Sequence, residues 1–262
     1  MKWGITVDIL FVAIMTVIVF AALLAVITQM IKTIQIKCFK KNTPVMPKGF
    51  TVTAHTGCLG TAPNTVDAME KGVKAGADIV EFDLNFDKNG EPVLSHNEPE
   101  EGAVHLREAF KFLAEHKNIK ANVDVKDTSN LGSVLKYAEE YGVLGRIFFT
   151  GIFAKDVSAV ERLCPQIPYY LNYSVSLNGN NDEAYISHIV ETVKNSGAIG
   201  ININYKTASK QLANAFRAEG LLVSLWTVNS KCGFYKVLKL RPDNITTKRP
   251  DILCDILGKF NI

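Results

Sequence analysis

The stretch DIVEFDLNFDKNGEPVLSH (78–96) reads as two strands joined by a tight turn. The Asn-Gly pair at 89–90 is typical of a tight hairpin turn. A strand that returns from a hairpin runs antiparallel, so the second run cannot be a stave of a parallel sheet. Alternation along the first run places Glu81 and Asp83 on one face and Phe82 on the other.

Short β-branched runs of the same kind recur along the rest of the chain. Between most of them lie amphipathic segments such as NTVDAMEKGVKAGA (64–77) and TASKQLANAFRAEG (207–220), which have helical periodicity. Strand–helix alternation favours a parallel sheet covered by helices. The runs are TVTAH (51–55), DIVEFDL (78–84), EPVLSH (91–96), IKANVDVK (119–126), RIFFTG (146–151), PYYLNY (168–173), AIGINI (198–203), LLVSLWTV (221–228) and DNITT (243–247).

The number of these runs points to a particular parallel architecture. Without the return strand of the hairpin, eight of the nine runs remain as staves. Eight staves over about 210 residues predict a (β/α)8 TIM barrel, with the hairpin as an excursion after the second strand. A doubly wound open sheet is the alternative, although such a sheet is usually shorter.

The N-terminal run ILFVAIMTVIVFAALLAVITQM (9–30) contains no charged residue. About 20 apolar residues span the hydrocarbon core of a bilayer as a helix. The apolar region of a cleaved signal peptide is usually about 7–15 residues and ends at a small-residue site, which this run lacks. The sequence therefore predicts a transmembrane anchor over residues 1–31, a basic, proline-containing linker over 32–49 and the barrel domain over 50–262.

The charges beside the apolar run indicate its orientation. Five lysines lie within residues 32–48, whereas Lys2 alone precedes the run. The positive-inside tendency places the barrel in the cytoplasm, and an extracytoplasmic barrel is the alternative. The net charge of +3, without a dense basic stripe, argues against nucleic acid as a partner.

The cysteines are few and scattered. No two of them form a Cys-x-x-Cys pair, so neither a disulfide framework nor a zinc site is expected, and a reducing compartment is weakly favoured. They are Cys38, Cys58, Cys164, Cys232 and Cys254.

Polar side chains gather at the carboxyl ends of the predicted staves, which is the end where TIM barrels carry their reacting groups. His55 ends the first strand, and Glu81 and Asp83 lie near the end of the second. His96 ends the returning strand of the hairpin, which brings it back near Asp83. Two histidines on one rim suit proton transfer, with one as the base and the other as the acid.

The next stave adds three further polar side chains to this rim. Asn122, Asp124 and Lys126 share one face of the run 119–126. Together with the two carboxylates of the second strand, Asp124 makes a group that repels itself unless a positive charge holds it. A hard divalent cation such as Mg2+ or Ca2+ does this with oxygen ligands, so we expect one here.

These motifs, in this order, resemble those of the glycerophosphodiester phosphodiesterases, relatives of the phosphatidylinositol-specific phospholipases C. That family opens with His-Arg-Gly and Pro-Glu-Asn-Thr and continues with Gly-Ala-Asp, Glu-x-Asp and a turn followed by a strand that ends in His. The resemblance extends over the whole soluble part. The matching stretches are AHTG (54–57), APNT (62–65), AGAD (75–78), EFD (81–83), DKNGEPVLSH (87–96), NVDVK (122–126), WTVN (226–229) and ITTKRPD (245–251).

The resemblance implies a role for each matching polar residue. By it, the histidines are the catalytic acid and base, the carboxylates hold the metal, and the lysine neutralises charge on the phosphate. The implied sets are catalytic His55, His96 and Lys126; metal-binding Glu81, Asp83 and Asp124; and substrate-binding Trp226, Lys126 and Asn64.

The implied activity is that of a membrane-anchored, metal-dependent hydrolase. It would cleave glycerophosphodiesters or lysophospholipids to an alcohol and a phosphomonoester by histidine acid–base catalysis. The chain departs from the family pattern at Thr56, where Arg usually follows the first His, and within 62–65, where the Glu is missing. Two other functions stay open: a catalytically degenerate barrel that binds phospholipid headgroups, and a phospholipase D-like or cyclic-phosphate-forming enzyme.

Overall fold

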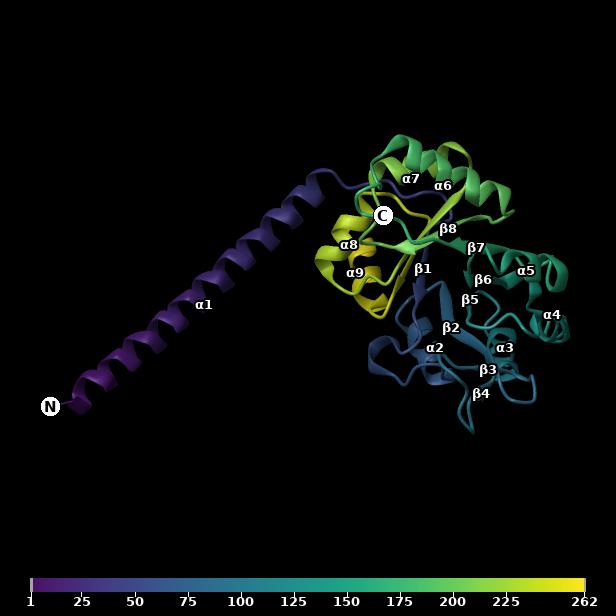
Figure 1. Ribbon diagram of the computed structural model, residues 1–262, viewed down its shortest axis with the longest axis horizontal. Coiled ribbons are helices and arrows are strands. Elements are labelled where there is room, and N and C mark those ends of the chain that lie inside the picture. Colours follow the sequence, from purple (N-terminus) through teal and green to yellow (C-terminus); the bar gives the residue numbers. More distant parts are fainter. Residues whose placement is uncertain (1, 262) are drawn as a thin grey trace. The chain divides into compact units, whose positions relative to one another are not determined.

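The first of the two units of this chain is a single long helix. The computed structural model describes residues 2–261 and separates Met1–Thr43 from Pro44–Ile262. Helix α1 (Lys2–Lys41) contains the stretch Leu10–Ile31, which is long and apolar enough to cross a membrane and is nowhere buried (Figure 1). A signal sequence near the N-terminus has the same length and composition. The helix also includes the first part of the expected linker, as far as Lys41.

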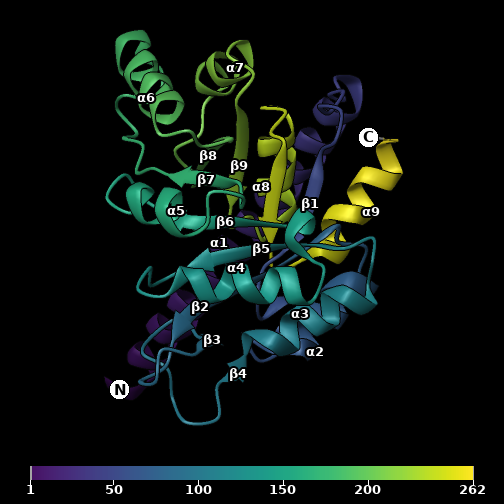
Figure 2. The ribbon, with the colours of Figure 1, turned by 90° about the vertical axis from the view of Figure 1, so that its right-hand side faces the viewer.

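The second unit is a closed parallel barrel, which confirms the predicted TIM-barrel fold. Among the described residues, eight parallel strands form one ring, because the first stave pairs with both the last and the second. Figure 2 shows helices arranged outside the ring. In order around the ring, the staves are β1 (Thr51–Ala54), β2 (Ile79–Phe86), β5 (Lys120–Val125), β6 (Ile147–Ile152), β7 (Tyr169–Asn172), β8 (Gly200–Asn204), β9 (Leu222–Trp226) and β10 (Asn244–Thr247).

A helix follows each stave and returns the chain to the opposite end of the barrel. Several helices begin at a side-chain cap: Thr65, Ser209 and Ser230 each accept a backbone N–H from the first turn. The helices are α2 (Val66–Lys74), α3 (Leu106–Glu115), α4 (Leu131–Glu140), α5 (Val157–Leu163), α6 (Glu183–Asn195), α7 (Lys210–Ala218), α8 (Lys231–Leu238) and α9 (Pro250–Phe260), with short 3-10 turns η1 (Cys58–Gly60) and η2 (Leu144–Arg146).

The hairpin after β2 is present as expected. Strand β3 (Pro92–Leu94) pairs antiparallel with β2, with Leu84 opposite Leu94, and Gly90 in the connecting turn has φ 78°. A further strand, β4 (Val104–His105), pairs with β3 and was not expected. Two residues are too few to produce an alternating pattern, so β4 arises from pairing with its neighbour.

The interior of the barrel is polar, while the apolar side of each stave faces the helices. On β2 and β5 the register sets Glu81 beside Asn122 and Asp83 beside Asp124, and Phe82 on the opposite face is fully buried. Hydroxyl and amide groups of the other staves fill the rest of the interior and bond to one another, as buried polar groups must. They include Thr53, Thr150, Asn202, Ser224, Asn244 and Thr246.

Two of the cysteines pack in the barrel unit as apolar groups. Cys58 and Cys164 are buried, and burial raises the pKa of both thiols, that of Cys164 to about 12. A buried thiol with a raised pKa is a poor nucleophile, so both serve packing. The side chain of Cys38 lies outside the described residues.

Candidate active site

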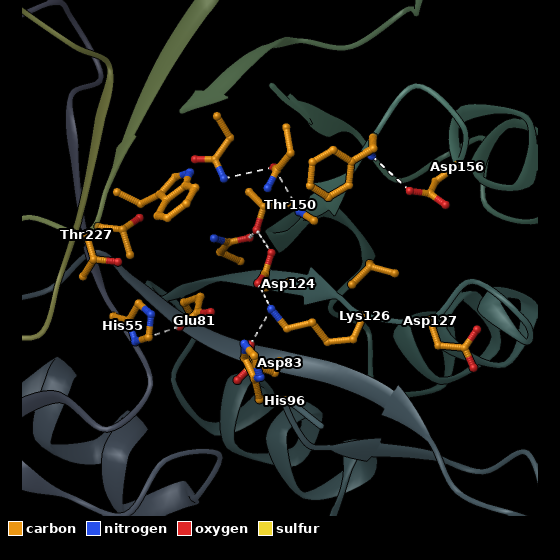
Figure 3. A pocket seen from close by; sticks show the side chains of 18 of the residues that line it. His55, Glu81, Asp83, His96, Asp124, Lys126, Asp127, Thr150, Asp156 and Thr227 are labelled. Carbon is orange, nitrogen blue, oxygen red and sulfur yellow. Dashed lines mark hydrogen bonds and ion pairs between the residues drawn. The ribbon is translucent and has the colours of Figure 1, made fainter. Parts of the chain in front are cut away.

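A cavity of about 770 Å³ opens at the carboxyl ends of the staves (Figure 3). All residues with a predicted catalytic or metal-binding role line it, and so does Trp226. The predicted residues in its wall are His55, Glu81, Asp83, His96, Asp124, Lys126 and Trp226. The rim therefore brings together groups that are up to 171 positions apart in the chain, from His55 to Trp226 (226 − 55 = 171).

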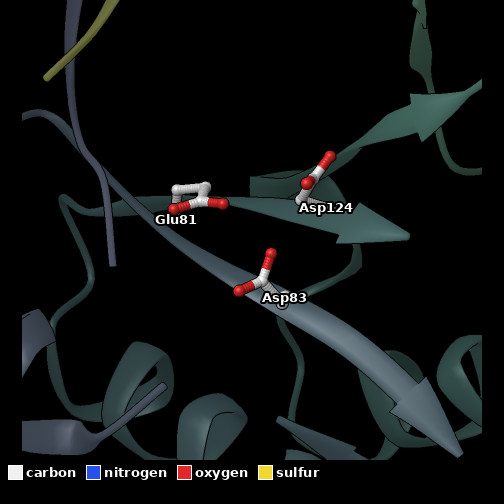
Figure 4. Close-up of side chains that lie close together, drawn as sticks. All are labelled: Glu81, Asp83 and Asp124. Atoms are coloured by element: carbon white, nitrogen blue, oxygen red, sulfur yellow. The ribbon is translucent and has the colours of Figure 1, made fainter. Parts of the chain in front are cut away.

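Three carboxylates converge on the wall formed by β2 and β5 (Figure 4). Glu81 and Asp83 occupy alternate positions on β2, and the parallel register places Asp124 of β5 directly beside Asp83. One oxygen of each carboxylate lies within 4.8 Å of the others. Glu81 is only 5% exposed and Asp83 only 4%. Such a group requires donors or a positive charge, because water cannot screen it.

The loop after β1 supplies donors to two of these carboxylates. Asn64 Nδ2 donates to Asp83 Oδ2 at 3.0 Å, and the backbone N–H of Asp83 donates back to Asn64 Oδ1 at 3.0 Å. The backbone N–H of Thr56 donates to Glu81 at 2.7 Å, while the Thr56 hydroxyl accepts the Asn64 backbone N–H. Asn64 is buried and is not part of the cavity lining, so its substrate-binding role stays a prediction.

Lys126 provides the positive charge between the two aspartates. Its Nζ lies 2.9 Å from Asp83 Oδ1 and also pairs with Asp124 Oδ2, and its side chain is 22% exposed. The hydroxyl of Thr150 on β6 lies 2.8 Å from Asp124 Oδ1. Burial opposes the charge of Lys126, but the adjacent Asp124 and Asp83 outweigh it and raise the pKa of the lysine. Lys126 is therefore a permanent cation in this wall.

Of the three carboxylates, Glu81 is the one whose negative charge is least balanced by groups of the protein. Burial, together with the charges of Asp124 and Asp83, raises the pKa of Glu81 well above its ordinary value. Oxygen ligands at this spacing are the set that Mg2+ or Ca2+ prefers. The residues thus fit a divalent cation that would neutralise the cluster together with Lys126.

His55 lies at the end of β1 with one ring nitrogen engaged. Its Nδ1 is 2.7 Å from the carbonyl oxygen of Thr56 and 3.7 Å from Glu81 Oε2. A carbonyl only accepts hydrogen bonds, so Nδ1 carries the proton, and Nε2 of the neutral ring is left with its lone pair. Burial lowers the pKa of His55, partly opposed by the Thr56 carbonyl, which keeps the ring neutral near pH 7.

His96 lies in the loop that follows β3, exposed at the mouth of the cavity. The backbone N–H of Ser95 donates to the Asp83 carbonyl at 3.1 Å, which holds this loop against β2. Nδ1 of His96 lies 3.1 Å from Asn97 Oδ1. The two histidines therefore occupy different settings in one cavity, one largely buried and one open to solvent.

The far wall of the cavity contains polar residues that the motifs did not single out. Asn172 Oδ1 accepts N–H groups from Gly151 and Asn202, each at 3.0 Å, and both asparagines line the cavity. The indole N–H of Trp226 is buried and has no acceptor among the described residues. The sequence offered one signal for this wall, namely the asparagines at the ends of the predicted strands around residues 172 and 202. That they lie side by side becomes evident only when the ring of strands is closed.

Comparison with known proteins agrees with this geometry. The model of the glycerophosphoryl diester phosphodiesterase family matches residues 55–107. A glycerophosphodiester phosphodiesterase of Caldanaerobacter subterraneus is 22% identical over 247 residues, which cover 79% of this chain and 98% of the relative.

Solved structures of low identity share the fold. A glycerophosphodiester phosphodiesterase of Parabacteroides distasonis has a TM-score of 0.66 at 17% identity and covers 82% of this chain and 99% of its own. A phosphodiesterase of Oleispira antarctica, solved with the product sn-glycerol-3-phosphate, has a TM-score of 0.63 at 17% identity and covers 81% of this chain and 97% of its own.

The fold and the site together define a class: a (β/α)8 barrel with acidic, basic and histidine side chains gathered at its carboxyl rim. Within that class, the chain is similar to the glycerophosphoryl diester phosphodiesterase family, whose model matches its residues 55–107, and to full-length relatives that are glycerophosphodiester phosphodiesterases.

The Lys126→Met substitution tests the electrostatics of the wall. It removes the ammonium from Asp83 and Asp124 while keeping much of the apolar stem. In chelator we expect the free energy of unfolding to fall by about 3 kcal/mol, because an ion pair in a largely buried site is broken. Millimolar Mg2+ or Ca2+ should then restore more stability in the variant than it adds to the wild type.

Denaturant unfolding with chelator and with each cation measures both effects. Lys120→Met, an exposed lysine on the same strand, is the matched control and should change neither. An unchanged stability in chelator, or an equal response to cations in both proteins, would contradict this account of the wall.

Proposed function

We propose that this chain is a metal-dependent phosphodiesterase that hydrolyses glycerophosphodiesters or lysophospholipids to an alcohol and a phosphomonoester. The observation that carries the proposal is the convergence of His55, His96 and three carboxylates in one cavity at the rim of the barrel. Similarity to glycerophosphodiester phosphodiesterases supports the reaction class.

The two histidines divide the proton transfers between them. His55 acts as the base, because its Nε2 carries a lone pair and its pKa is lowered by burial. It takes the proton of the attacking hydroxyl, which forms the new bond to phosphorus. His96, at the open mouth, gives a proton to the alcohol oxygen as the second phosphorus–oxygen bond breaks.

The carboxylate wall binds the cation and the phosphate. Glu81, Asp83 and Asp124 would hold a divalent cation, which neutralises charge on the phosphoryl oxygens when it is bound. Lys126 stays charged beside them and attracts the same oxygens. Asn64 and Thr56 act as positioning residues, since each holds a carboxylate in place.

Lys248 replaces the arginine that the family carries after its first histidine. Thr56 uses both its N–H and its hydroxyl within the loop, so it offers no donor to a phosphate. Lys248 follows β10, lines the same cavity and is close enough to His55 to contribute to the lowering of that pKa. Its ammonium would bind the phosphate as a point charge, without the two-pronged geometry of Arg.

Trp226 would bind the remainder of the substrate. Its ring lines the cavity opposite the carboxylates, and its buried N–H lacks an acceptor among the described residues. The face of the ring, which borders the cavity, would pack on the apolar part of the substrate.

Two alternatives remain in other classes. The self-contained hydrogen bonding of Thr56 favours a barrel that binds headgroups without turnover. A cyclic-phosphate product is the other, because the same two histidines serve when the attacking hydroxyl belongs to the substrate. Product analysis separates all three outcomes.

The full chain in detergent should hydrolyse glycerophosphodiesters with Mg2+ or Ca2+ and lose this activity in chelator. His55→Ala should reduce kcat by about a thousandfold, because acid–base catalysis typically contributes 10²–10⁴. Glu81→Gln should abolish the response to the cation. Phosphorus NMR of the products distinguishes a phosphomonoester from a cyclic phosphate.

Asp127→Asn is the matched control for these variants. Asp127 lines the same cavity, but its carboxylate binds the N–H and hydroxyl of Ser129 and lies outside the metal-binding cluster. A wild-type chain that binds the diester and the cation but forms no product would refute the enzyme and favour the binding barrel.

Lys248→Met should raise KM for a glycerophosphodiester about tenfold while changing kcat less, if the lysine contacts the phosphate mainly in the bound ground state. Lys248→Arg should retain most of the affinity. A KM unchanged in Lys248→Met would show that the lysine does not replace the missing arginine. Steady-state kinetics under saturating cation provides this comparison.

The N-terminal helix would anchor the enzyme in a membrane with the barrel on the cytoplasmic side. Its apolar stretch Leu10–Ile31 and the lysines that follow it support this arrangement. We expect the intact chain, including residues 1–31, in the membrane fraction, with the barrel protected from protease added to the outer side. A shortened, soluble chain would refute the anchor, and a digested barrel would refute the orientation.

A further inference from the structure

Exposed apolar side chains of the barrel unit lie mostly on the catalytic rim. Among its described residues, the large apolar side chains that are exposed are Val45, Leu59, Phe153 and Leu177. The last three lie on loops that leave β1, β6 and β7 toward their helices, and they are 37%, 44% and 63% exposed. Among the described residues of the unit, only Val45 is an exposed large apolar residue away from the rim, so three of the four gather there.

Unpaired cations lie on the same part of the rim. Lys155, Lys206 and Lys248 occupy the loops after β6, β8 and β10, and none has a carboxylate in ion-pair range among the described residues. The acids in the loops after β6 and β7 are engaged locally: Asp156 accepts the Phe153 N–H at 3.1 Å, and Asp182 caps α6.

The free acids of the rim lie at its other edge. Glu98, Glu100 and Glu101 are exposed in the loop between β3 and β4, which flanks β2. The rim is thus divided into an acidic edge and a basic–apolar arc that follows the consecutive staves β6 to β10 and β1. We define the basic–apolar arc as Leu59, Phe153, Lys155, Leu177, Lys206 and Lys248.

The basic–apolar arc encloses the mouth of the cavity. Phe153, Lys155 and Lys248 are part of the cavity lining itself. Leu59 follows β1 and Leu177 follows β7, which lie on opposite sides of the ring. A flat surface that touches both leucines therefore covers the mouth.

We propose that the basic–apolar arc rests on an anionic lipid bilayer, with its apolar side chains at the acyl boundary and its lysines among the headgroups. Apolar groups rimmed by cations are the composition that binds such an interface. A second copy of this chain is disfavoured, because two such arcs would bring like charges together. The acidic edge would be repelled and remain in water.

Contact of the basic–apolar arc with a bilayer would narrow the substrate class of the proposed enzyme, and this part of the inference rests on the proposed function. The substrate would be a lysophospholipid or a similar single-chain phosphodiester taken directly from the bilayer, with its phosphate drawn up into the cavity.

The first test measures the bilayer depth of one tryptophan added to the full chain, which also contains Trp3 and Trp226, in phosphatidylcholine vesicles with and without phosphatidylglycerol. Leu177→Trp places a probe on the basic–apolar arc, and Glu101→Trp is the matched probe on the acidic edge. Brominated acyl chains should quench the added emission of Leu177→Trp about threefold more than that of Glu101→Trp, after subtraction of the wild type. The difference should shrink without phosphatidylglycerol and at high salt.

Equal quenching of the two probes would overturn the proposal. So would shielding of the Leu177→Trp probe in lipid-free detergent solution at high protein concentration, because that result would assign the arc to a protein partner.

The second test separates docking from catalysis. Leu177→Asp should leave hydrolysis of water-soluble glycerophosphocholine unchanged and lower hydrolysis of vesicle-resident lysophospholipid about tenfold. Val45→Asp, which changes an exposed apolar side chain away from the rim, should lower neither. Equal rates of Leu177→Asp and wild type on the vesicle substrate would overturn the proposal. If the wild type hydrolyses neither substrate, the proposed function fails, while the quenching result still decides the docking.

Discussion

The parallel register between β2 and β5 is the constraint on which the rest of the site depends. It sets Asp83 directly beside Asp124, with Glu81 two positions earlier on the same face. Such a group of buried carboxylates is unfavourable alone, so the surrounding structure is organised to hold it. Lys126 extends from the end of β5 to pair with both aspartates. A shift of one residue in this register would turn the carboxylates toward the helices and leave the cavity without them.

The loop after β1 shows how a departure from the family motif is accommodated. Thr56 cannot contact a phosphate as Arg does, but its N–H binds Glu81 and its hydroxyl binds the backbone of Asn64. Asn64 in turn holds Asp83 through two hydrogen bonds. The loop therefore positions two of the carboxylates that we propose as metal ligands. In our proposal, the phosphate-binding charge comes from Lys126 and from Lys248, which lies at the other end of the barrel sequence.

Polar, charged and apolar groups are unevenly distributed over the barrel interior and the rim. Hydroxyl and amide groups of the inner faces bond to one another below the cavity, so the polar environment continues from the barrel interior to the rim. At the rim itself, charge and apolar surface separate into two regions. The proposed bilayer contact uses this asymmetry, because it would hold the cavity mouth at the source of a single-chain lipid substrate.

The sequence by itself determined the staves, the hairpin and most of the candidate site. Alternation and turn chemistry are local, so the faces of Glu81, Asp83 and Asp124 and the turn at 89–90 were predictable. The two-residue β4, the Asn64 contact with Asp83 and the place of Lys126 between two aspartates were not. The same holds for the far wall of asparagines and for Leu59 and Leu177 on one rim. Each of these depends on how the ring closes, and distances between residues far apart in the chain are decided only when β10 pairs with β1.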